Sequence, residues 1–206
     1  MSLDRNQCVE MDRSDPLAEV RTRFVLPENT IYLDGNSLGP LPVAVQDSLD
    51  SAVQVEWGAD LISSWNRHDW IGLPRWVGEK IAAIIGAGPG QVVATDSTSI
   101  NVFKLLSAAL KAPQGRKVIL STRENFPPDL YMAEGLSLLL GQNRCELRVV
   151  GADEVLEHLD EDTAVLMLTH VDFRSGRIFD MEAMTAAARE AGALSMWDLA
   201  HSAGAV

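Results

Sequence analysis

The second half of the chain alternates short apolar runs with longer stretches of helical period, and this alternation restricts the fold more than any other feature. Apolar runs expected as strands lie at 92–94, 117–120, 146–150, 164–168 and 193–197. Stretches expected as helices lie between them at 99–110, 128–140, 152–159 and 180–191. Strands that alternate with helices pair in parallel and are joined by right-handed crossovers. We therefore expect an α/β fold with a mainly parallel, doubly wound sheet.

The beginning of the chain is less regular. A polar lead-in carries a short helix at 17–24, and a brief strand at 31–33 ends in the dense turn signal DGNSLGP. A longer helix is expected after Pro42, because apolar residues recur at helical spacing from Val45 to Trp57. The first part of the chain therefore predicts an arm followed by one amphipathic helix.

The next segment has no clear period. Residues 58–76 hold several aromatic side chains among glycine and proline, and they lead into a helix expected at 75–85. We assign residues 1–56 to an N-terminal arm and helix, and residues 57–206 to one domain.

The composition excludes several classes of partner. Lysine and arginine number 17 against 29 acidic residues, which gives a net charge of −12, and such a surface repels nucleic acid and anionic lipid. No apolar run reaches the ~18 residues needed to span a membrane, and the start lacks the apolar core of a signal peptide. Cys8 and Cys145 have no metal-ligand or redox spacing. We expect a cytoplasmic protein that binds no nucleic acid, membrane or metal.

Polar side chains follow four of the five predicted strands. The run TDSTSIN at 95–101 either caps the next helix or, with the helix dipole, binds an anion. The run ENFPPD at 124–129 offers a ring and a carboxylate, and it suits either a binding site or a plain helix start. The run THVD at 169–172 is interpreted as a hydrogen-bonding loop, since no further metal ligands stand at a fitting spacing. Asp198 and His201 follow the last strand.

These four strand ends meet at one edge of a parallel sheet, where α/β sheets bind ligands. A buried carboxylate such as that of Asp198 requires a cation or hydrogen-bond donors. The edge offers an anion cradle, a flat ring and a carboxylate. That combination indicates a planar aromatic cofactor with a phosphate and a basic ring nitrogen.

At these residues the chain resembles pyridoxal 5′-phosphate (PLP) enzymes of the aspartate-aminotransferase-like superfamily, and more closely the kynureninase family. The resemblance extends from about residue 24 to the end. The part of the resemblance that is specific to this family is the combination of Gly-Asn-Ser-Leu-Gly with Phe-Pro-x-Asp. The motifs that carry it are LDGNSLG at 33–39, STSIN at 97–101, NFPPD at 125–129, SGR at 175–177 and WDLAHSAG at 197–204.

The resemblance implies roles for four residues near the starts of two helices. Thr98 and Ser99 would hold the cofactor phosphate at a helix N-terminus. Phe126 would stack on the pyridine ring, with Asp129 as a second carboxylate nearby. The implied fold is the large domain of a PLP-dependent transferase.

It implies further roles at the last two strand ends. Thr169 would contact the cofactor, and His201 would support it from beside Asp198. Asp198 would pair with the protonated ring nitrogen, which makes the ring an electron sink.

The activity implied by the resemblance is hydrolysis of L-kynurenine, or 3-hydroxykynurenine, to L-alanine and anthranilate, or 3-hydroxyanthranilate. This reaction belongs to tryptophan catabolism and, in some organisms, to pyridine nucleotide biosynthesis, and the implied assembly is a homodimer. Trp65, His68 and Trp70 either wall the aryl pocket of the substrate or anchor an irregular segment.

The chain departs from the family pattern at one point. The family's Schiff-base lysine lies downstream of the strand that ends at Asp198, whereas the lysines here are Lys80, Lys104, Lys111 and Lys117. The family's C-terminal domain, with its carboxylate-binding arginine, is also absent. We therefore expect residues 57–206 to form a truncated PLP-binding large domain, and the chain to be the N-terminal half of a kynureninase, inactive alone.

Two other readings remain open. One is another PLP-dependent lyase such as a cysteine desulfurase, which the Gly-Asn-Ser-Leu-Gly segment disfavours. The other is a non-catalytic binding module with the same fold.

Overall fold

The computed structural model describes residues 3–112 and 115–205. Its internal contacts divide the chain into two compact units, Met1–Leu73 and Pro74–Val206, which are considered separately below. The sequence-based domain limit after residue 56 falls inside the first of these units, and the assignment of residues 57–206 to one domain stays a prediction.

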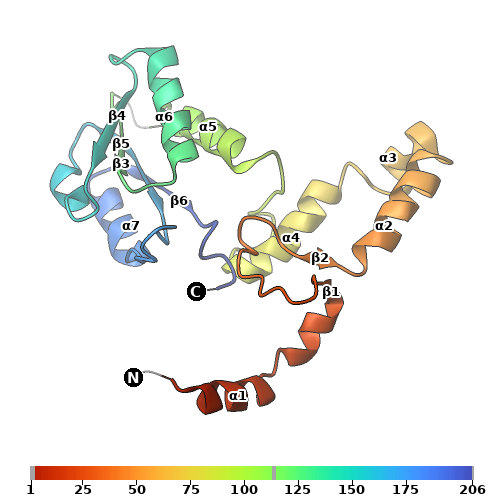
Figure 1. Cartoon of the computed structure of the whole chain (residues 1–206). Coiled ribbons are helices and arrows are strands. Elements are labelled where there is room, and N and C mark those ends of the chain that lie inside the picture. The colour runs from red at the N-terminus through yellow and green to blue at the C-terminus, as the bar shows by residue number, and fades with distance from the viewer. Residues whose placement is uncertain (1–2, 113–114, 206) are drawn as a thin grey trace. The chain divides into compact units, whose positions relative to one another are not determined.

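The second unit is built on a sheet of four parallel strands, shown in Figure 1. In sheet order these are β4 (Glu146–Val150), β3 (Val118–Thr122), β5 (Thr163–Thr169) and β6 (Leu194–Asp198). The chain passes from β3 to β4 on one side and then returns to β5 on the other side of β3. The order therefore reverses between β3 and β5, and such a switch point is where α/β sheets bind ligands.

Helices cover both faces of this sheet, as expected for a doubly wound fold (Figure 1). Ile119, Val165 and Met167 pack with α5 (Thr98–Ala109) and α6 (Pro127–Leu140). Leu120, Leu166 and Leu168 point to the opposite face and pack with α7 (Met181–Glu190). Each fully buried leucine or valine contributes about 1.5–3 kcal/mol through burial of apolar surface. The predicted α/β fold with a parallel sheet is confirmed.

Local sequence signals place the helix ends at the edges of the sheet. Asp180 caps α7 by accepting a hydrogen bond from the Ala183 N–H at 2.9 Å. Two prolines occupy the first turn of α6, and that helix stops at Gly141, whose φ of 79° suits glycine. The prolines and Asp180 thus mark helix starts that follow the carboxyl ends of strands, whereas Gly141 ends α6 at the amino edge.

Two predictions for this unit are wrong in detail. Residues 92–94 form no strand: no described segment pairs with them as a ladder, and the Ala94 N–H instead donates to the Pro74 carbonyl at 3.0 Å. An apolar run alone does not supply the neighbouring strand that a ladder needs. The helix expected at 152–159 is a short 3₁₀ turn, η4 (Val155–His158).

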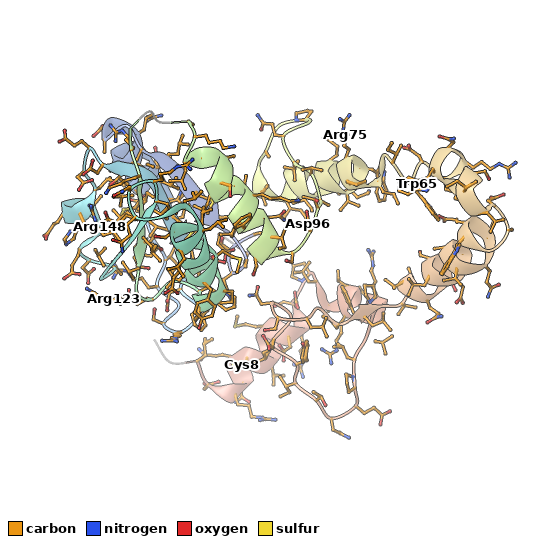
Figure 2. The ribbon with its side chains drawn as sticks, turned by 90° about the horizontal axis from the view of Figure 1, so that it is seen from above. Cys8, Trp65, Arg75, Asp96, Arg123 and Arg148 are labelled. Carbon is orange, nitrogen blue, oxygen red and sulfur yellow. The ribbon has the colours of Figure 1, made fainter. Side chains whose placement is uncertain are left out.

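The first unit is mostly helical. Its elements are α1 (Arg5–Arg13), η1 (Ala18–Arg23), β1 (Phe24–Val25), β2 (Leu41–Pro42), α2 (Val45–Ser51), η2 (Ala52–Trp57), η3 (Leu61–Ser63) and α3 (Ser64–Arg67). Figure 2 shows Cys8 on α1 and Trp65 on α3. Helix α4 (Leu73–Ile85) begins at the last residue of this unit and continues into the second.

The strand expected at 31–33 is also wrong. Ile31 and Leu33 are largely exposed, and the strand pair of this region is instead β1 with β2, in which Phe24 lies opposite Pro42. The helix predicted after Pro42 is present, although its second half, η2, is a π-helix. No helix in the described part of the chain is long and apolar enough to cross a membrane.

Candidate functional site

The carboxyl ends of β5 and β6 bring two of the predicted site residues side by side. Thr169 is paired in register with Asp198, two residues beyond the Met167–Met196 pair. Alternate residues of a strand share a face, so Thr169 and Asp198 lie on the face covered by α5 and α6. A cavity of about 300 Å³ opens here, and its lining includes Thr98, Asn101, Asp129, Met196 and Asp198.

Two carboxyl groups lie together in this cavity, that of Asp129 buried and that of Asp198 half-buried. Asp129, in the first turn of α6, is 1% exposed, and neither of its oxygens has a hydrogen-bond donor within the described residues. Burial, and then the nearby carboxylate of Asp198, raise the pKa of Asp129 to about 7. Asp198 Oδ1 itself accepts a hydrogen bond from the Ala200 N–H at 2.7 Å. The pair requires either a shared proton or a cationic donor between its two members.

The start of α5 is a capped helix N-terminus beside the cavity. Ser97 caps the helix, so its hydroxyl accepts from the Ile100 N–H, while Thr98 lines the cavity. The Asn101 side chain donates to the Thr95 carbonyl at 2.8 Å and closes the preceding loop. The unpaired N–H groups and the dipole of a helix start favour a phosphate. From the sequence, residues 95–101 could either cap the helix or bind an anion. The capping hydrogen bond is made by Ser97.

Asn125 is a site residue to which the sequence analysis gave no role. It lies at the switch point between β3 and β5 and is 4% exposed. Its side chain joins the Ser121 hydroxyl, the Phe126 N–H and the Thr169 hydroxyl. It stands in the quoted NFPPD motif, but hydrogen bonds of this kind leave no periodic signal in a sequence.

A chain of aromatic rings extends from α6 toward the end of β6. Phe173 meets Phe126 edge to face, with ring centroids 5.4 Å apart and planes at 89°. Phe173 also stacks on His201, with centroids 6.4 Å apart and planes at 28°. Two residues predicted at the cofactor are thus joined through Phe173, which the sequence analysis missed because it lies between two motifs.

The loop that carries Phe173 is held by short-range hydrogen bonds. Val171 and Ile178 form an antiparallel bridge, and Asp172 Oδ1 accepts from the Ser175 N–H and hydroxyl, both at 2.6 Å. Burial alone would raise the pKa of Asp172, but these hydrogen bonds hold it below its usual value. Asp172 is therefore engaged in loop structure, as the sequence predicted for THVD.

A second cavity, of about 550 Å³, adjoins the ends of β3, β4 and β5. It is lined by Asn125 and Thr169 and by charged groups of the surrounding loops, among them Arg123, Asp153, Glu154 and Arg177. These charges are paired with one another: Arg123 with Glu154 at 3.3 Å and Arg177 with Asp153 at 2.8 Å. Figure 2 labels Arg123 in this unit.

The three residues predicted at the substrate lie in the first unit and contact their own neighbours there. Trp65 and Trp70 pack edge to face with centroids 5.8 Å apart. His68 Nε2 lies 2.8 Å from Asp60 Oδ2. Their part in a substrate pocket stays a prediction. No group of three or more acidic, histidine or cysteine side chains suited to a metal occurs among residues 3–112 and 115–205.

Comparison with protein families matches residues 75–206 to the aminotransferase class-V family. Over 98% of its length the chain is 50% identical to a kynureninase of Pseudomonas fluorescens, of which it covers 50%. A kynureninase of Deinococcus radiodurans is 50% identical over 99% of the chain, again with 50% of the relative covered. The chain thus spans about half the length of the curated relatives it matches.

Two solved structures are similar in fold. A lysine-to-alanine mutant of C-DES, with glycine covalently linked to the PLP cofactor, covers 100% of this chain at a TM-score of 0.68 and 16% identity, with 51% of its own length matched. The apo cysteine desulfurase of Thermococcus onnurineus covers 88% of this chain at 0.64 and 20% identity, with 46% of its length matched. At such low sequence identities the similarity shows the fold alone.

Proposed function

Because the chain belongs to the aminotransferase class-V family, we propose that it forms the cofactor-binding part of a kynureninase. The proposed reaction is PLP-dependent hydrolysis of L-kynurenine, or of 3-hydroxykynurenine, to alanine and the corresponding anthranilate. The observation that carries the proposal is the pairing of the buried Asp129 with Asp198, taken together with 50% identity to kynureninases over half of their length.

The residues of the second unit fit PLP. The oxygens of Asp129 have no hydrogen-bond donor within the described residues, and the adjacent Asp198 adds a second carboxylate, so a protonated ring nitrogen would bring both a donor and a positive charge. Thr98 and Ser99 begin a helix whose free N–H groups suit a phosphate. Phe126 offers a ring for stacking, and Thr169 and His201 complete the proposed set around it.

Each of these residues has a distinct part in the proposed mechanism. When bound, PLP supplies an electron sink for bond breaking in the substrate. Asp198 holds the proton at the ring nitrogen, and its own orientation is fixed by the Ala200 N–H. Asp129 adds a second negative charge that keeps this proton bound. The Phe126 face excludes water from one side of the ring, and Phe173 supports that face.

None of the lysines in the chain lines either cavity. Lys104 pairs with Asp96, and Lys117 Nζ lies 3.6 Å from Glu146 Oε2 at the amino end of the sheet. Lys80 lies over the Trp76 ring at 4.4 Å. We propose that the covalent lysine comes from outside these 206 residues and that they have no kynureninase activity alone.

We also propose a homodimer for the full-length protein. Tyr131, Leu138 and Leu139 on α6 are more than half exposed, and such apolar surface favours burial against another chain or segment. Light scattering of the full-length protein tests this, and a monomer at micromolar concentration would contradict it.

The proposed function is tested with the full-length protein and two substrates. We expect PLP to give a visible absorbance band and L-kynurenine to yield alanine and anthranilate in equal amounts. Release of alanine from L-cysteine instead would favour the desulfurase reading, which the solved structures support only at the level of fold. Absence of PLP binding would contradict both enzymatic readings and leave the non-catalytic module.

A further inference from the structure

The direction of each hydrogen bond around Asn125 can be deduced from one backbone group. The Phe126 N–H lies 2.7 Å from Asn125 Oδ1, and a backbone N–H can only donate. The oxygen of the Asn125 amide is therefore the atom that faces Phe126. This fixes which way the side-chain amide points, a choice that the position of its heavy atoms alone leaves open.

The other half of the network agrees with this orientation. Asn125 Nδ2 donates to Ser121 Oγ at 2.8 Å and lies 3.5 Å from the Met167 carbonyl oxygen. The Ser121 hydroxyl in turn donates to the same carbonyl at 2.8 Å, and a carbonyl can only accept. Because Ser121, Asn125 and Thr169 are each at least 95% buried, no bulk water competes for these bonds.

The consequence falls on Thr169. Its hydroxyl is bonded to Asn125 Oδ1, an oxygen that cannot donate, so Thr169 must give its single proton to that bond. Only the lone pairs of Thr169 Oγ1 remain for a ligand. Thr169 lines the 550 Å³ cavity and is paired in register with Asp198, which lines the 300 Å³ cavity proposed for the cofactor, so a ring held at Asp198 would lie beside Thr169.

We propose that Thr169 presents only a hydrogen-bond acceptor to the bound cofactor, and that Asn125 is the positioning residue that enforces this polarity. The cofactor group that meets Thr169 is then a donor, held in its protonated form. This inference rests on the proposed function, because it concerns the same cofactor site. A hydroxyl that can only accept a hydrogen bond stabilises the protonated state of the group that donates to it.

The test is a pH titration of the visible absorbance of bound PLP in the full-length protein. Thr169→Val removes the acceptor while keeping the shape, so the pKa of the bound cofactor should fall by about 0.5–1 unit. Thr169→Ser keeps the same acceptor and should retain the wild-type pKa. Asn125→Ala frees the Thr169 hydroxyl to donate, so the pKa should fall at least as far as in Thr169→Val.

Ser121→Ala is the matched control. It removes a buried hydrogen bond from the same network but leaves the Phe126 N–H to orient Asn125, so the melting temperature should fall while the cofactor pKa stays. A raised or unchanged pKa in Thr169→Val, with PLP bound, overturns the inference and leaves the proposed function standing. Failure of the wild-type protein to bind PLP overturns the proposed function itself.

Discussion

The buried Asp129, in the first turn of α6, lies against the half-buried Asp198, the last residue of β6, so that two acidic side chains from distant parts of the sequence meet. Two ionised carboxylates at such a position repel each other. The carboxyl edge of this sheet therefore favours either a shared proton or a positively charged group between the two side chains.

The acid pair makes the cofactor-free protein less stable as the pH rises. The pKa of Asp129 is about 7 in the folded state against an ordinary 3.8, so between roughly pH 4 and 7 the folded state retains a proton that the unfolded state releases. Stability falls with rising pH across that window and then levels. In Asp129→Asn this loss should vanish, leaving the variant about 1–3 kcal/mol more stable than wild type at pH 8. Urea unfolding of the PLP-free full-length protein at pH 5 and pH 8 measures this, and an equal slope in both proteins would contradict it.

Replacement of Asp198 should remove the electron sink while leaving the cofactor in place. Asp198→Asn cannot carry the negative charge that holds a proton at the ring nitrogen, so kcat should fall about 100-fold or more. The phosphate site proposed at the start of α5 would be untouched, so PLP should still bind. Steady-state kinetics and absorbance spectra of the full-length variant check the two statements, with Asp153→Asn, an exposed acid, as the control.

Phe173 should contribute to cofactor affinity through the rings it contacts. Phe173→Ala leaves Phe126 and His201 without their common neighbour, and an aromatic pair is worth about 0.5–1.5 kcal/mol. We expect the PLP dissociation constant to rise roughly 3–10-fold. Phe173→Tyr keeps the ring and should bind PLP like wild type. Equal affinity of the alanine variant in a fluorescence titration would show that Phe126 holds its position unaided.

Two helical glycines should respond oppositely to alanine. A Cβ on Gly78 in α4 would collide with the Val92 carbonyl, so Gly78→Ala should cost about 1–3 kcal/mol. Gly135 in α6 has open space at its Cβ position, so Gly135→Ala should stabilise by about 0.5–1 kcal/mol. Thermal melting of the two full-length variants tests this, and a loss of stability in Gly135→Ala would contradict the packing described for α6.

The parallel sheet could be predicted because its strands carry strong local signals. The expected helices and strands from 99 to 197 agree with α5 to β6 within about two residues at most ends, apart from the short η4. Buried strands such as β5 are apolar throughout, and the helices between them have clear caps. Local pattern and tertiary packing agree there.

The errors of secondary-structure prediction have two causes. Some segments depend on contacts with distant parts of the chain, and one helix start was overlooked in the sequence. The run at 92–94 is as apolar as a strand, but a strand needs a neighbour. Helix α1 was not predicted, although Asp4 and Gln7 form a capping box that marks its start.

The site was predictable in its residue types and less so in its connections. The carboxylates and hydroxyls at the strand ends follow from topology, because parallel strands end at one edge. The contact of Asp129 with Asp198, the ring contacts of Phe173 and the hydrogen bonds of Asn125 depend on side-chain geometry, which no spacing rule encodes.

The proposed site residues lie at the carboxyl edge of the sheet, and none of them lies at the opposite, amino edge. The turn at 141–144, which connects α6 to β4, is exposed and lies at the amino end of that strand. This turn should therefore tolerate the insertion of a peptide. A reporter peptide inserted between Gln142 and Asn143 should therefore leave the proposed cofactor site intact.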